Sequence, residues 1–305
     1  MNTLVKISLA IGALIFSSGV FSCSLQENDS NNINLEELVP ISLNGTTVFV
    51  DSLGIIQKEL SGICSGFHDG LAVFRNQKGR YGFVDKTGKE IISCKYKEAY
   101  SFSNGLARVK NSNGLYGFIN MEGKEIIPCK YKDADYFSDG LVSVKSSNGL
   151  YGFVDETGKE IIPCKYDKAY PFSDGLAMVK STNGLYGYID LTGKEITPCK
   201  YEYAYSFSNS LAKVQNSNNL YGFIDITGKE VIPCKYKSAD DFSDGLVKVE
   251  SIGGLYGYVN KTGEEVIPCK FIDDFTFHDK YWVATEPNGK ISIISSTTAH
   301  TLFRY

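Results

Sequence analysis

The sequence predicts an all-β fold built from tandem repeats. A Tyr-Gly pair recurs six times, each copy 35 residues after the one before it. A cysteine and a phenylalanine keep the same spacing, and the 30 glycines, 20 tyrosines and 18 phenylalanines favour turns and strands over a catalytic centre. Periods of roughly 20–50 residues are typical of stacked arrays. We therefore predict about seven tandem 35-residue units, each with three strands.

The N-terminal segment has the parts of a secretory signal. An apolar run over residues 7–20 is shorter than the roughly 20 apolar residues of a transmembrane helix. Residues 20–23 (Val-Phe-Ser-Cys) resemble a bacterial lipobox, which implies removal of residues 1–22 and lipid attachment to Cys23, with the membrane as a partner. A secreted protein with a free cysteine is the alternative. Residues 23–42 would be the lipidated cysteine and a polar tether, whose acidic residues resemble those of surface-exported lipoproteins and imply the outer membrane or cell surface.

Within one unit, strands alternate with tight turns. Residues 116–120 (Tyr-Gly-Phe-Ile-Asn) place side chains on two faces with period two, which predicts a strand. In the next unit a Thr-Gly turn leads to a returning strand at residues 159–162, and Pro163 is expected to end it because proline cannot donate to a ladder. Residues 176–180 predict the third strand. The only helical expectation is a single turn near residues 166–169.

The two ends of the array are degenerate copies. Residues 46–51 and 290–295 match the repeat imperfectly, as capping units of a stacked array do. Pairing between these leftover strands would close a propeller-like ring. A period of 35 residues is short for a four-stranded blade of about 40–45 residues, so an open β-superhelix is the competing architecture. The two alternatives stay open at this point.

Four short motifs follow one another in each unit. The pattern is an aromatic-Gly pair, then Asp-x-x-Gly-Lys, then Ile-Ile-Pro-x-Lys-Tyr, then Phe-x-(Asp/Glu)-Gly-Leu-Ala, with single substitutions in several units. This order resembles the WG-repeat family of bacteria, with Tyr-Gly in place of Trp-Gly. The resemblance covers residues 43–305 and implies β-structured binding modules, often on exported proteins, without common catalytic residues.

Positions that recur in every unit are assigned to the repeat core, since stacked units bury a shared core. They are Tyr81, Gly82, Tyr116, Gly117, Tyr151, Gly152, Tyr186, Gly187, Tyr221, Gly222, Tyr256, Gly257, Cys94, Cys129, Cys164, Cys199, Cys234 and Cys269.

The recurring cysteines are interpreted as small buried apolar residues. Metal sites need ligands at short spacing, and no histidine recurs beside these cysteines. A disulfide needs Cα atoms about 4.4–6.8 Å apart, whereas packed sheets lie about 10 Å apart. We therefore predict no metal and no cofactor. Cys64 is out of phase, and it is either a free thiol or the partner of another cysteine.

Positions that change between units are the better candidates for recognition. Tyrosines vary in place and give way to acidic residues later in the chain, and acidic pairs are interpreted as solvated turn carboxylates. His68 and His278 occupy the same turn in the first and last units and are expected to be exposed. The variable tyrosines and the acidic pairs are Tyr100, Tyr136, Tyr170, Tyr205, Asp240-Asp241 and Asp273-Asp274.

The predicted function is binding without catalysis. A net charge of −4 and a pI near 5.5 exclude a broad basic surface for nucleic acid. No Ser/His/Asp arrangement is supported, and no glycine-rich loop opens a helix, so we expect no enzyme. We predict a lipid-anchored cell-envelope scaffold for a protein partner. The alternative is a carbohydrate- or peptidoglycan-binding module that uses exposed tyrosines.

Overall fold

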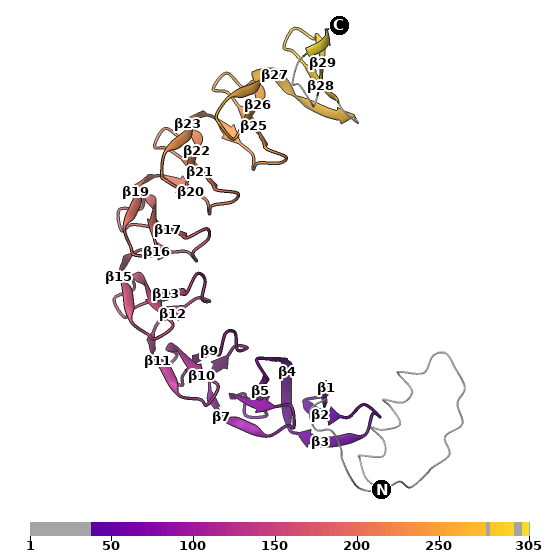
Figure 1. The fold of residues 1–305 in the computed structure, drawn as a ribbon, viewed down its shortest axis with the longest axis vertical. Helices are drawn as coiled ribbons and strands as arrows, with labels where there is room; N and C mark the ends of the chain where they lie inside the picture. The colour runs from indigo at the N-terminus through magenta and orange to yellow at the C-terminus, as the bar shows by residue number, and fades with distance from the viewer. Residues whose placement is uncertain (1–37, 279–280, 296–300, 305) are drawn as a thin grey trace, which may run out of the picture. The chain divides into compact units, whose positions relative to one another are not determined.

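The computed structural model describes residues 38–278, 281–295 and 301–304, all within the unit Glu36–Tyr305. Every regular element in these ranges is a β-strand (Figure 1). The predictions on the signal segment and on Cys23 lie outside the described residues. No helix in the described ranges is long and apolar enough to span a membrane.

The strands form antiparallel sheets that follow one another in chain order. The first sheet has three strands, β1 (Val39–Leu43), β2 (Thr46–Val50) and β3 (Ile56–Leu60), so regular structure begins inside the segment expected to be tether. Five four-stranded sheets follow: β4 (Gly62–His68), β5 (Leu71–Asn76), β6 (Tyr81–Asp85), β7 (Glu90–Tyr96); β8 (Glu98–Ala99), β9 (Leu106–Lys110), β10 (Tyr116–Asn120), β11 (Glu125–Tyr131); β12 (Asp133–Ala134), β13 (Leu141–Lys145), β14 (Tyr151–Asp155), β15 (Glu160–Tyr166); β16 (Lys168–Ala169), β17 (Leu176–Lys180), β18 (Tyr186–Asp190), β19 (Glu195–Tyr201); β20 (Tyr203–Ala204), β21 (Leu211–Gln215), β22 (Tyr221–Asp225), β23 (Glu230–Tyr236). The last sheet contains β24 (Ser238–Ala239), β25 (Leu246–Glu250), β26 (Tyr256–Asn260), β27 (Glu265–His278), β28 (Tyr281–Thr285), β29 (Ile291–Ser295) and β30 (Thr301–Arg304).

Each complete repeat has four strands rather than the three predicted. The additional strand has two residues and pairs with the strand that follows it, as β16 pairs with β17. The helical turn expected near residues 166–169 is therefore wrong. The Asp167 amide instead donates to the Lys180 carbonyl at 2.8 Å, across the two strands. Two residues carry no detectable alternation, so the periodicity of the sequence could not predict this strand.

Pro163 lies inside β15, which corrects the prediction that it ends a strand. β15 is an edge strand of its sheet, so the missing N–H leaves no ladder bond unmade. The register between β14 and β15 shifts nearby, between the pairs made by Tyr151 and Phe153. A Cβ on Gly152 would lie 2.4 Å from the Ile162 carbonyl oxygen, and the other five Tyr-Gly glycines have equivalent contacts of 2.4–2.7 Å. This close approach of two backbones explains the glycine of each Tyr-Gly pair.

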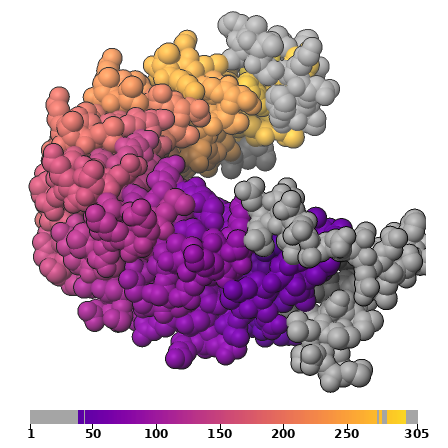
Figure 2. Space-filling view, turned by 60° about the horizontal axis from the view of Figure 1, so that its bottom comes forward, coloured from indigo at the N-terminus to yellow at the C-terminus, as the bar shows by residue number. Residues whose placement is uncertain are grey.

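The core lies between neighbouring sheets. Phe118 and Ile119 are adjacent in β10 and point to opposite faces, so Ile119 joins a buried cluster with Phe83 of the sheet before. Phe118 joins a cluster with Val144 of the sheet after. An aromatic pair completes each of these junctions, for example Phe153–Phe172 with ring centroids 4.8 Å apart. In Figure 2 consecutive repeats lie against one another along the colour gradient. One unit alone therefore leaves both of its apolar faces uncovered.

No strand pairing joins the two ends of the array within the described ranges. The leftover strand predicted at residues 46–51 is β2, which pairs with β1 and β3. The strand predicted at residues 290–295 is β29, which pairs with β28 and β30. Each of these strands is thus held in its own sheet, and no pairing among the described strands closes a ring.

Candidate functional site

The recurring residues lie at the junctions between sheets. The tyrosines of the Tyr-Gly pairs are half-buried, except Tyr186, which is buried. The recurring cysteines are free and half-buried, and all six, such as Cys129, pack against the buried clusters. Burial raises the pKa of Cys129 and Cys234 to about 11, so these thiols are protonated near neutral pH. Cys64 is also free, with a pKa raised to about 11 by burial.

The residues that change from repeat to repeat meet along a different line, which we call the junction strip. In each complete repeat the residue after the short strand lies opposite the third residue of the next strand, as Tyr100 lies opposite Arg108 with a backbone bond of 3.0 Å. Most of these side chains line cavities at the junctions between sheets, and Met178 is buried in the core. The junction strip comprises Glu98, Tyr100, Arg108, Asp133, Asp135, Tyr136, Ser143, Lys168, Tyr170, Met178, Tyr203, Tyr205, Lys213, Ser238, Asp240, Asp241 and Lys248.

At one junction the opening is filled by Arg108. Its guanidinium donates to the Ala134 carbonyl of the next sheet. Its central carbon lies 3.9 Å from the Tyr100 ring centroid and 4.2 Å from that of Tyr136. The cation is thus held between two rings from neighbouring sheets. Glu98 fixes one of these rings by accepting a 3.2 Å hydrogen bond from the Tyr100 hydroxyl.

Lys213 crosses the equivalent junction three repeats later, beside a cavity of about 300 Å³. Its ammonium donates to the Ala239 carbonyl at 3.2 Å and to the Asp241 carboxylate at 2.8 Å. The same nitrogen lies 4.7 Å from the Tyr205 ring centroid. A cation over a tyrosine ring, donating to an alanine carbonyl of the next sheet, is therefore a repeated arrangement of this fold.

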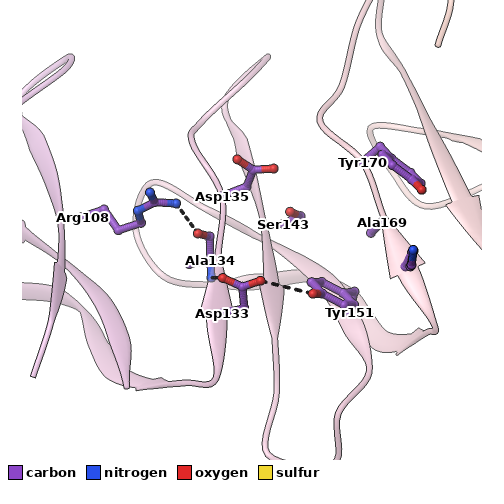
Figure 3. Close-up of a pocket in the computed structure, with 9 residues that line it drawn as sticks. Arg108, Asp133, Ala134, Asp135, Ser143, Tyr151, Ala169 and Tyr170 are labelled. Atoms are coloured by element: carbon purple, nitrogen blue, oxygen red, sulfur yellow. Dashed lines mark hydrogen bonds between the residues drawn. The ribbon is translucent and has the colours of Figure 1, made fainter. Parts of the chain in front are cut away.

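Between these two junctions a cavity of about 390 Å³ opens beside Ser143 (Figure 3). Asp133 and Asp135 line it from the same sheet as Ser143, and Tyr170 lines it from the next sheet. The Tyr151 hydroxyl donates to Asp133 at 3.2 Å. Burial, followed by the Asp133 charge, raises the pKa of Tyr151, which keeps its hydroxyl protonated. The cavity is lined by two carboxylates, Asp133 and Asp135, and by the cationic side chains of Arg108 and Lys168.

Three tyrosines of the junction strip expose much of their surface. Tyr136 and Tyr203 are each 58% exposed and Tyr205 is 45% exposed. The Tyr203 ring stacks on Tyr186 with centroids 6.3 Å apart and planes 20° apart. Sequence reasoning singled out Tyr136 and Tyr205 but missed Tyr203.

Sequence reasoning also missed the residues that fill or open the junctions. Arg108, Ser143 and Lys213 occupy one repeat position, where Met178 and Lys248 also stand. A different residue type in almost every unit was the signal that could have identified this position. The role of this position becomes clear only from the structure, in which the next sheet lies over it.

The predicted acidic pairs do not form a metal centre in the described part of the chain. Asp240 and Asp241 line a second cavity of about 420 Å³ with Trp282, and Asp241 also pairs with Lys213. Over the described residues, no group of three or more His, Cys, Asp or Glu side chains is placed to hold a metal ion. His68 is exposed at its turn. The side chains of Asp273, Asp274 and His278 lie outside those that the structure describes.

Comparison with known proteins gives one sequence match. A family model described as "WG containing repeat" matches residues 81–116, 116–151, 151–186, 186–220, 221–256 and 256–277 in succession. No curated protein sequence matches the chain.

Solved structures resemble the chain only distantly. A computationally designed protein, Ika8, is 16% identical over 79% of this chain and 85% of its own, with a TM-score of 0.35. BamB from Moraxella catarrhalis is 12% identical over 88% of this chain and 99% of its own, with a TM-score of 0.35. Dihydro-heme d1 dehydrogenase NirN in complex with DHE is 12% identical over 92% of this chain and 75% of its own, with a TM-score of 0.32.

Proposed function

The chain belongs to the WG containing repeat family, and we propose that it is a non-catalytic binding scaffold for a protein partner at the bacterial cell envelope. The observation that supports this proposal is the junction strip. Side chains that differ between repeats gather along it, while the recurring tyrosines, glycines and cysteines support the junctions. A rigid framework with one variable line of side chains suits recognition of an extended partner surface.

The chemistry of the junction strip also suits a protein interface. Tyrosine and arginine are the residues that most often dominate binding energy between proteins. Exposed Tyr136 stands beside Arg108, whose guanidinium is already fixed by the Ala134 carbonyl. Because these side chains are ordered before binding, little conformational entropy is lost when a partner docks.

The proposed place of action is the outer membrane or cell surface. It rests on the lipobox-like residues 20–23 and on the signal-like segment before them. Lipid on Cys23 would hold the array at the membrane, with each buried CH₂ contributing about 0.8 kcal/mol.

Exchange of the exposed tyrosines tests the proposal. We would purify the tagged full chain from detergent-solubilised envelope, as wild type and with Tyr136, Tyr203 and Tyr205 all changed to Ala. A matched control changes Met121, Leu191 and Ile226 to Ala, since these turn residues are also exposed, by 39%, 38% and 48%. Wild type and control should recover one partner protein in fixed stoichiometry, and the tyrosine variant should not. Equal recovery by all three chains would reject the proposal.

A carbohydrate ligand is the second candidate. It is favoured by the exposed rings of Tyr136, Tyr203 and Tyr205, because a tyrosine offers a flat apolar face together with a hydroxyl. Retention of the wild-type chain on peptidoglycan or glycan resin, lost in the triple tyrosine variant, would favour this candidate. Failure of the wild-type chain to be retained would remove it.

A further inference from the structure

Ser143 is shorter than the side chains at the same position of other repeats, and a cavity lies beside it. Arg108 and Lys213 stand at the same repeat position as Ser143, and each crosses its junction to an alanine carbonyl of the next sheet. Serine is too short to cross. The volume of about 390 Å³ beside it lies within the range of binding sites for small groups, about 300–1,000 Å³.

Two polar groups that line this cavity have no side-chain partner among the described residues. Ser143 is only 3% exposed, and its hydroxyl has no hydrogen-bond partner among the described residues. The Ala169 carbonyl is equivalent to those of Ala134 and Ala239, and no side chain of the described residues donates to it. Because Ser143 lines the cavity, its hydroxyl is open to a hydrogen bond with a ligand group.

An acidic residue replaces an aromatic one at the same place. Asp135 stands where Tyr100 and Tyr205 stand in the filled junctions. One oxygen of the Asp135 carboxylate accepts a 2.9 Å hydrogen bond from the Tyr136 amide. The other has no donor in the part of the chain that the structure describes. In the Lys213 junction the cation pairs with Asp241 at 2.8 Å, which stands one position later, where Tyr136 stands in the Arg108 junction.

We propose that the Ser143 cavity binds the cationic side chain of an arginine or lysine from the partner protein. The inference rests on the proposed function and names the chemistry of that partner. The incoming cation would donate to Asp135 and to the Ala169 carbonyl, beside the Tyr170 ring. Like Arg108 and Lys213, it would donate to an alanine carbonyl of the next sheet, but with the Asp135 carboxylate in the place of the ring that Tyr100 or Tyr205 supplies.

Two cations also line the cavity, and neither occupies this place. The Arg108 guanidinium is already bound to the Ala134 carbonyl and held between two tyrosine rings. Lys168 is exposed on the short strand of the next sheet and forms no ion pair in the described residues. Asp133 is the other carboxylate of the cavity, and it already accepts from Tyr151. Asp135 therefore remains the carboxylate available to a ligand.

The repeat itself provides a variant that should fold and block the site. Ser143→Arg places at residue 143 the side chain that stands at residue 108, and Ser143→Lys copies residue 213. Each should cross the junction to Ala169 and fill the cavity, so thermal stability should not fall below that of wild type. Asp135→Asn keeps the shape of the cavity and removes its free charge. Glu156→Gln, at an exposed turn away from the cavity, is the matched control.

The test uses N-acetyl-arginine amide as probe and N-acetyl-citrulline amide as its neutral counterpart, titrated into the full chain in detergent and followed by NMR. Wild type and Glu156→Gln should bind the arginine probe at least about tenfold more tightly than the citrulline probe. Ser143→Arg and Asp135→Asn should lose this preference. Equal binding of both probes, or binding that survives Ser143→Arg, would overturn the proposal.

Partner recovery from the envelope separates this inference from the proposed function. If wild type and Ser143→Arg recover the same partner equally well, the scaffold function stands and the role of the cavity is rejected. If wild type recovers no protein partner, the scaffold function is rejected, while the probe titration still decides whether the cavity binds a cation. Both the scaffold function and the role of the cavity are supported if Ser143→Arg recovers the partner at least about tenfold more weakly than wild type and also no longer binds the arginine probe.

Discussion

Replacement of Gly152 by alanine tests the explanation of the Tyr-Gly pair most sharply. The added Cβ would lie 2.4 Å from the Ile162 carbonyl oxygen and 2.7 Å from the Cys164 nitrogen. Ordinary contact begins at 3.4 Å, so the two strands would have to separate by about 1 Å. All the obstructing atoms belong to the backbone and cannot rotate away. We therefore expect a loss near the upper end of the cost of overpacking, about 3 kcal/mol.

The control is Gly253→Ala, where the nearest atom to the new Cβ is the Ser251 hydroxyl at 3.8 Å and the backbone is not left-handed. This change should be neutral or stabilise by up to about 1 kcal/mol through the unfolded state. Unfolding in urea gives the two midpoints. Because a repeat array can unfold in parts, hydrogen exchange of β14 and β15 should show local opening only in Gly152→Ala. Equal stability of the two variants would refute the close-approach argument.

Three further predictions follow from packing, the filled junction and the thiols. Phe172→Ala should cost about 3–5 kcal/mol in urea unfolding, because the ring is 3% exposed and packs on Phe153; a loss below 1 kcal/mol would contradict the inter-sheet core. Arg108→Ala should lower the free energy of unfolding by about 1–3 kcal/mol. Arg108→Lys should keep most of this stability, because Lys213 makes the equivalent contact at its own junction. Equal losses of stability in the two variants, measured by thermal unfolding, would argue against the shared arrangement. Burial raises the pKa of Cys94 and Cys129 from 9.0 to about 11, so the folded chain holds more protons than the unfolded chain between these values. The stabilisation that comes from these two protonated thiols should be complete below pH 9 and should fall as the pH rises through 11. A chain with both cysteines changed to Ala should fall less steeply over the same range; identical pH profiles would contradict the prediction.

The strands with clear alternation could be predicted from the sequence. Residues 116–120 and 176–180 coincide with β10 and β17. The period of 35 residues identified the repeating unit because each unit is a complete sheet. The short strand β16 was missed because two residues have no pattern, and Pro163 was misplaced because edge position cannot be read from a single strand.

The candidate site was predictable only in part. Variation among Tyr100, Tyr136 and Tyr205 pointed to the junction strip, because it departs from an otherwise regular repeat. Arg108 and Ser143 were not singled out. Their importance depends on the next sheet, whose carbonyl lies 26 residues further along the chain in each case and is brought close only by stacking. The pairing of the two end strands within their own sheets could not be predicted either, because the period of the sequence does not specify which strands pair.

Site-specific photo-crosslinking in intact cells tests the central claim most directly. A benzophenone amino acid would replace Tyr136 or Tyr203, each 58% exposed on the junction strip, or Leu191, 38% exposed at a turn away from it. The account predicts one discrete protein adduct from both strip positions and none from residue 191. An adduct of equal yield from residue 191, or no protein adduct from either strip position, would contradict the claim that the junction strip is where this protein binds its partner.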